Sequence, residues 1–142
     1  PLFRSGNFAK TMLKLAAERD ALTIINDQHG APTGADLLAD VTAHAVRQTL
    51  ARPELGGLYH LVAGGETTWY DYARHVIEHA RARGVSVKVA PEAIRPVPTS
   101  AFPTPAARPL NSRLATGRLQ SAFGLVLPPW QRGVDRMLDE II

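Results

Sequence analysis

The sequence has 142 residues, 45% of them hydrophobic and 20% charged, which is typical of one globular domain with a single core. It contains no cysteine, so disulfides, thiolate metal sites and cysteine nucleophiles are excluded. The net charge of +3 comes from arginines scattered among acidic residues, which disfavours nucleic acid as a partner. No apolar run approaches the roughly 20 residues that cross a bilayer, and no signal-peptide pattern opens the chain. We therefore expect a cytoplasmic protein with no membrane partner.

The first third of the chain predicts two helices separated by a short strand. Asn7 is a favoured N-cap, and apolar residues follow it at helical spacing up to about residue 19. The β-branched run Leu22–Ile25 predicts a strand, which the turn-forming residues 26–33 end. An apolar stripe from Leu37 to Leu50 predicts a second, longer helix that packs on a core. Ahead of all these, Pro1–Arg4 resembles the end of a buried strand.

The middle of the chain predicts a third helix flanked by extended segments. Leu58–Val62 follows two glycines and predicts a strand, and residues 69–83 have the pattern of a helix that ends at Gly84. Val85–Val89 alternates like a strand exposed on one face, and Ile94–Val97 predicts another short extended piece.

The last third predicts a proline-stiffened loop and two helices. Five prolines between Pro96 and Pro109 exclude a helix or a central strand, so this stretch is expected to be an extended loop. Thr116 is expected to cap a short helix that runs through Phe123. A terminal amphipathic helix is predicted after Pro129.

These elements predict an α/β unit with more helix than strand. The strands are few, short and separated by helices, which makes a poor sheet on its own. We therefore interpret the chain as a lobe that completes a larger α/β domain, whose parallel strands would be encoded upstream.

Five stretches carry a resemblance to one family. They are Gly6–Leu13, Asp27–Thr33, Gly57–Leu61, Pro98–Ala106 and Arg108–Leu114. In order and spacing these stretches are similar to dTDP-4-dehydrorhamnose reductases, which are extended short-chain dehydrogenases/reductases. The resemblance implies a Rossmann domain that binds NADPH, followed by a smaller lobe that grips a nucleotide sugar.

The chain departs from that family pattern in the parts that perform the chemistry. It contains no Gly-x-Gly-x-x-Gly loop for a dinucleotide. None of Tyr59, Tyr70 and Tyr72 is followed four positions later by the lysine of a Tyr-x-x-x-Lys catalytic pair. We therefore expect residues 1–142 to be the C-terminal substrate-binding region, with the NADPH-binding domain and all catalytic residues absent from this chain.

The resemblance implies that the intact enzyme reduces dTDP-4-dehydro-L-rhamnose to dTDP-L-rhamnose with NADPH, for cell-surface polysaccharide synthesis. Three groups of residues in this chain are then expected to hold the dTDP-sugar. The groups are Asn7, Phe8 and Lys10; Asp27, Gln28, Gly30, Ala31 and Pro32; and Arg108, Asn111, Ser112 and Arg113.

Each group has a physical rationale and an ordinary alternative. A helix N-terminus with a lysine favours an anion, but Asn7 and Lys10 are equally explained as an N-cap and a solvated cation. The amide of Gln28 is suited to reading a thymine edge, although a plain turn explains it too. Arginines after a stiff loop suit a diphosphate, but they also suit surface ion pairs. Trp69 is expected to pack the third helix rather than to contact a base.

Two further expectations also come from the resemblance. Carboxylates matching Asp36 and Glu140 are expected to bind Mg²⁺ between two copies of the chain in a homodimer, although helix-end charges explain them as well. The rival interpretation of the whole chain is a non-catalytic binding module, related to the regulatory subunits of methionine adenosyltransferases.

Overall fold

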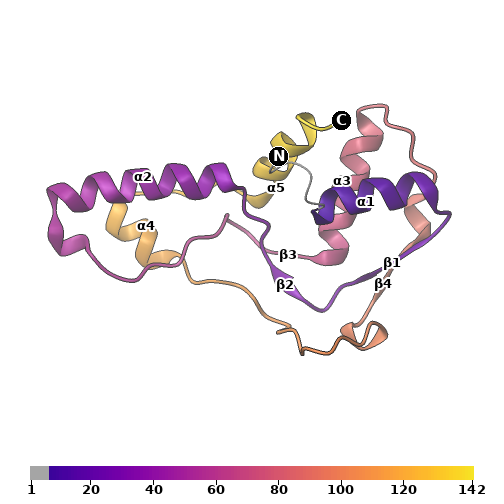
Figure 1. The fold of residues 1–142 in the computed structure, drawn as a ribbon, viewed down its shortest axis with the longest axis horizontal. Helices are drawn as coiled ribbons and strands as arrows, with labels where there is room; N and C mark the ends of the chain where they lie inside the picture. Colours follow the sequence, from indigo (N-terminus) through magenta and orange to yellow (C-terminus); the bar gives the residue numbers. More distant parts are fainter. Residues whose placement is uncertain (1–6) are drawn as a thin grey trace.

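The computed structural model describes residues 7–142, which form helices and short strands (Figure 1). The helices in this part of the chain are Phe8–Glu18 (α1), Ala35–Ala51 (α2), Trp69–Ala82 (α3), Gly117–Phe123 (α4) and Trp130–Asp139 (α5). The strands are Leu22–Ile25 (β1), His29–Gly30 (β2), Thr67–Thr68 (β3) and Ile94–Val97 (β4). Short 3₁₀ turns cover Pro53–Leu55 (η2), Pro91–Ala93 (η3) and Thr99–Ala101 (η4). The strand end predicted at Pro1–Arg4 lies outside the described residues.

The strands form two small sheets. β1 and β4 run parallel, with Leu22 opposite Ile94 and Ile25 opposite Val97, which confirms the strand predicted over Leu22–Ile25 and the short extended piece predicted over Ile94–Val97. β2 and β3 pair antiparallel, with His29 opposite Thr68. Across residues 7–142 no helix is both long enough and apolar enough to cross a membrane.

The helices begin where the sequence predicts, for identifiable reasons. The side chain of Asn7 accepts a hydrogen bond from the Lys10 amide at 2.8 Å, which caps α1. The hydroxyl of Thr68 accepts one from the Asp71 amide in the same way and caps α3. The Thr116 hydroxyl makes no capping bond to α4, contrary to expectation, because the backbone of Thr116 is helical rather than extended; its hydroxyl accepts a hydrogen bond from the Gln120 side chain.

The apolar side chains form two clusters rather than the single core expected. The larger cluster joins α1, α3 and α5 to the β1–β4 sheet. Its buried members are Ala9, Met12, Ala16, Leu22, Ile24, Ala63, Ala73, Val76, Ile77, Val89, Ile94, Trp130, Val134 and Leu138. The smaller cluster lies where α2 meets α4, and its buried members are Val41, Leu119, Phe123 and Leu127. In Figure 1, α2 and α4 lie side by side at one end of the molecule and α1 and α3 lie at the other, which separates the two clusters.

The prediction of a strand over Val85–Val89 is wrong. The amides of Lys88 and Val89 both donate to the carbonyl of Ala16, at 2.9 and 3.1 Å, near the end of α1. This segment therefore caps a helix, and its buried Val89 side chain joins the core instead of one face of a sheet.

The prediction of a strand over Leu58–Val62 is also not met within the described residues. No described strand lies beside it, so its backbone has no ladder to join. This segment and the neighbouring α2 are only partly covered by other side chains: Leu58 is 76% exposed and Leu50, on α2, is 81% exposed. Between them lies an apolar groove of about 540 Å³, lined by α2, α4 and residues 55–61.

Candidate functional site

The strand β2 brings two of the three predicted site segments together. The amide of His29 donates to the carbonyl of Leu110 at 2.8 Å, and the amide of Ser112 donates to the carbonyl of His29 at 2.8 Å. Residues 26–33 and 108–113, about 80 positions apart in the sequence, therefore run side by side. On its other edge β2 pairs with β3, which leads directly into α3.

Asp27 holds the start of the proline-rich loop. Its carboxylate accepts hydrogen bonds from the Thr99 amide at 2.9 and 3.0 Å and from the Thr99 hydroxyl at 2.6 Å. The hydrogen bond from the Thr99 side chain, followed by that from its backbone, holds the pKa of the Asp27 carboxyl below its ordinary value. Asp27 is therefore an anion that fixes η4, and much of its accepting capacity is already used.

Gln28 is a buried polar residue whose amide has a fixed orientation. The indole N–H of Trp69 donates to Oε1 of Gln28 at 3.1 Å, and Nε2 of Gln28 donates to the Thr99 hydroxyl at 3.0 Å. An amide has two N–H donors and two lone pairs on its oxygen. These protein contacts use one N–H donor and one lone pair of the Gln28 amide, so one donor and one lone pair remain.

Aromatic contacts connect the predicted site segment at the start of α1 to α3, whose Trp69 is hydrogen-bonded to Gln28. The ring of Phe8, in the first turn of α1, lies 4.7 Å from that of Trp69 and 5.1 Å from that of Tyr72, between ring centroids. Asn7 and Lys10 flank Phe8 at the N-terminus of α1, where backbone N–H groups and the helix dipole favour an anion.

Trp69 is the residue that sequence reasoning missed. It was expected only to pack α3, yet it is 37% exposed and contacts Phe8 on one side and Gln28 on the other. The sequence carries no signal for this role, because the hydrogen bond from Trp69 to Gln28 joins residues 41 positions apart.

The arginine segment presents exposed cations beside β2. Arg113 donates to Glu66 Oε2 at 2.8 Å and to Asn111 Oδ1 at 2.9 Å, and this hydrogen bond to Glu66 lowers the pKa of the Glu66 carboxyl. Arg108 is exposed, as are Asn111 and Ser112. The Arg113 side chain is about half exposed in its ion pair, so water and other anions can reach it.

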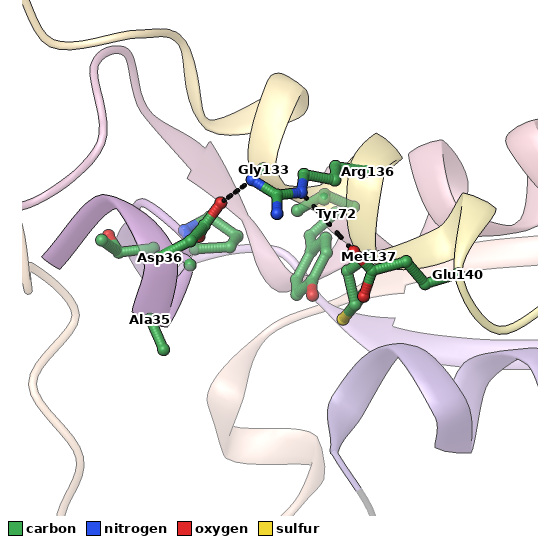
Figure 2. A pocket seen from close by; sticks show the side chains of 11 residues that line it. Ala35, Asp36, Tyr72, Gly133, Arg136, Met137 and Glu140 are labelled. Atoms are coloured by element: carbon green, nitrogen blue, oxygen red, sulfur yellow. Dashed lines mark hydrogen bonds and ion pairs between the residues drawn. The ribbon is translucent and has the colours of Figure 1, made fainter. Parts of the chain in front are cut away.

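A separate cavity of about 350 Å³ lies between the start of α2 and α5, and Pro32 is part of its lining (Figure 2). Arg136 pairs there with Asp36 at 3.0 Å and with Glu140 at 3.5 Å, so the guanidinium bridges the two carboxylates predicted to bind Mg²⁺. Tyr72 also lines the cavity, and burial raises the pKa of its hydroxyl.

These residues of one chain do not fit a magnesium site. Mg²⁺ takes six oxygens in near-octahedral geometry, whereas here two carboxylates share one guanidinium. Within residues 7–142 no three His, Cys, Asp or Glu side chains form a group suited to a metal ion. A site shared by two copies of the chain stays a prediction.

Small sheets flanked by helices, with polar loops joined at β2, define an α/β lobe. Residues 3–142 match the family model of the RmlD substrate binding domain, and the chain belongs to that family. The expected fold class, the C-terminal lobe of an extended short-chain dehydrogenase/reductase, is confirmed.

The similar proteins of known activity are dTDP-4-dehydrorhamnose reductases. The chain is 59% identical to that of Salmonella typhimurium over 138 residues, covering 97% of this chain and 46% of the relative. It is 40% identical to that of Burkholderia thailandensis, covering 98% and 48%. The chain therefore spans about half the length of these curated relatives.

Solved structures of reductases share the fold. The crystal structure of dTDP-4-dehydrorhamnose reductase from Clostridium acetobutylicum is 30% identical with a TM-score of 0.78, covering 97% of this chain and 45% of that one. The reductase from Bacillus anthracis, in complex with NADP, is 31% identical with a TM-score of 0.73, covering 96% and 44%.

Proposed function

We propose that this chain is the dTDP-sugar-binding lobe of a dTDP-4-dehydrorhamnose reductase, which reduces dTDP-4-dehydro-L-rhamnose to dTDP-L-rhamnose with NADPH. The observation that carries the proposal is the joining of residues 26–33 and 108–113 at β2, in a chain of the RmlD substrate binding domain family. Polar groups suited to a base and cations suited to a diphosphate thereby lie on adjacent segments of the chain.

The diphosphate is assigned to the cations and to the start of α1. Guanidinium groups pair with phosphate oxygens through two parallel hydrogen bonds, which suits Arg108 and Arg113. Asn111 and Ser112 add short polar side chains between them. The N-terminus of α1 with Lys10 supplies a second positive region.

The thymine is assigned to the loop before and after β2. Gln28 has one donor and one acceptor left to offer a base edge. Gly30, Ala31 and Pro32 supply a backbone with small side chains, which a flat ring can approach closely. Asp27 contributes indirectly, because its carboxylate holds Thr99 and with it the entry to the proline-rich loop.

Binding the dTDP moiety in this way converts remote binding energy into orientation of the sugar. The residues of this chain do not fit NADPH, since no glycine-rich loop or Tyr-x-x-x-Lys pair is present. NADPH supplies the hydride when bound. We assign the binding of NADPH and the proton donor to the part of the relatives' sequences that this chain does not match.

We assign the docking of that part to the apolar groove beside α2. The segment 58–62 contains apolar side chains at Leu58, Leu61 and Val62 and lacks a strand partner among the described residues, and the neighbouring Leu50 is largely exposed. A parallel strand added there would satisfy the backbone of residues 58–62 and cover the apolar side chains.

A homodimer with Mg²⁺ at Asp36 and Glu140, a location in the cytoplasm, and the lack of nucleic-acid and membrane partners stay predictions. The rival interpretation, a regulatory module related to methionine adenosyltransferase subunits, gains no support from the relatives described above, which are reductases.

The test is steady-state kinetics of the complete protein that carries this chain, following NADPH oxidation with dTDP-4-dehydro-L-rhamnose. Arg108→Ala is expected to raise KM roughly 10- to 100-fold with a smaller effect on kcat, because a charge-assisted hydrogen bond to the diphosphate is lost. Arg19→Ala, which removes an exposed arginine after the far end of α1, is the matched control and should leave KM unchanged. An unchanged KM for Arg108→Ala would remove Arg108 from the site, and no NADPH oxidation by the wild type would refute the function.

A further inference from the structure

Four residues form a directed chain of hydrogen bonds across the candidate site. The Trp69 indole donates to Gln28 at 3.1 Å, Gln28 donates to the Thr99 hydroxyl at 3.0 Å, and that hydroxyl donates to Asp27 at 2.6 Å. The chain starts at a group that can only donate and ends at an ionised carboxylate that can only accept. Its direction is therefore fixed at both ends.

This direction determines which way the Gln28 amide faces. If the amide rotated by 180°, its NH₂ group would point at the indole N–H of Trp69, two donors facing each other. Its oxygen would meet the Thr99 hydroxyl, whose single proton is already given to Asp27. Because Gln28 is buried, water does not replace the bonds that would be lost, and the flipped amide is strongly disfavoured.

The orientation of an amide matters for recognising a pyrimidine. Thymine presents a carbonyl next to an N–H group at ring position 3, whereas cytosine presents an amino group next to a bare ring nitrogen. An amide that suits one arrangement must rotate by 180° to suit the other. A Gln28 amide that cannot rotate can therefore distinguish the two bases.

We propose that Trp69 is a positioning residue that locks the Gln28 amide and thereby sets the preference of this site for thymine over cytosine nucleotides. The inference rests on the proposed function, since it requires dTDP to bind beside β2. Trp69 is also held in place from the other side, because its ring packs 4.7 Å from that of Phe8 at the start of α1.

The experiment compares the Kd of dTDP with the Kd of dCDP by isothermal titration calorimetry on the complete protein. Trp69→Phe keeps an aromatic ring against Phe8 but removes the N–H donor. We expect it to reduce the ratio of the two Kd values roughly 3- to 10-fold, the effect of one neutral hydrogen bond. Tyr70→Phe is the matched control, because it removes a donor to the Ile94 carbonyl from the same turn of α3 without touching Gln28.

A second variant guards against a purely structural effect. Thr99→Val removes the contact on the other side of Gln28, so it should also reduce the ratio, and combining it with Trp69→Phe should reduce the ratio further, because each contact disfavours the flipped amide separately. The thermal unfolding midpoint of each variant shows whether a lower Kd ratio reflects loss of the fold rather than loss of the preference for dTDP.

The outcomes distinguish this inference from the proposed function. A wild type that binds neither nucleotide refutes the proposed function itself. A wild type that prefers dTDP, with a ratio unchanged in Trp69→Phe or equally reduced in Tyr70→Phe, overturns the role of Trp69 alone. A wild type that binds dTDP and dCDP equally overturns base selection by Gln28.

Discussion

Leu138 tests whether the contact between α3 and α5 is the core that supports the site. Its side chain is fully buried in the larger apolar cluster. Leu138→Ala removes three carbon atoms at about 0.8 kcal/mol each, a loss of about 2.4 kcal/mol in transfer free energy. The cavity left behind raises the expected cost to about 3–4 kcal/mol of unfolding free energy.

The same substitution at Leu50 provides the control, because this side chain is 81% exposed at the groove beside α2. In the 142-residue chain, urea denaturation followed by circular dichroism should show a change below about 0.5 kcal/mol for Leu50→Ala. In a complete reductase, whose remaining part we place over that groove, Leu50→Ala should cost more than about 1 kcal/mol. Equal effects of Leu138→Ala and Leu50→Ala in the 142-residue chain would refute the assignment of the core, and an unchanged cost of Leu50→Ala in the complete protein would refute the docking surface.

Two further predictions concern the charged groups of the candidate site. The hydrogen bonds from Thr99 lower the pKa of the Asp27 carboxyl in the folded state, so the stability they contribute is present above the unfolded pKa and is lost as pH falls through the folded pKa. Thermal midpoints measured through this acid range should therefore fall less steeply for Asp27→Asn than for the wild type, and identical slopes would contradict the role of Asp27. Glu66→Gln removes the anion that competes for Arg113, so calorimetry should show tighter dTDP binding with little change in stability. Weaker binding would mean instead that Glu66 holds Arg113 in its productive position.

The local elements could be predicted from the sequence where local physics decides them. Asn7 and Thr68 cap α1 and α3 because their side chains accept hydrogen bonds from amides three residues later. The strand β1 follows from its β-branched composition, and β4 pairs with it in parallel. The three site segments are predicted from the family resemblance, and the structure brings two of them together at β2.

The remainder depends on contacts between distant residues, which spacing along the chain does not encode. Val85–Val89 has the alternation of a strand, but its amides meet the end of α1 rather than another strand. Leu58–Val62 has the composition of a strand, but a strand requires a neighbour and no described strand lies beside it. The bond from Trp69 to Gln28 joins residues 41 positions apart, so it emerged only from the fold.

Hydrogen–deuterium exchange of the complete protein, with and without dTDP, tests the central claim most directly. If residues 26–33 and 108–113 form the nucleotide site, dTDP should slow exchange in the peptides from each of these segments and in those from the start of α1. Peptides from the far end of α1 and from η3 should be unchanged. Protection confined to other regions, or no protection at saturating dTDP, would contradict the account.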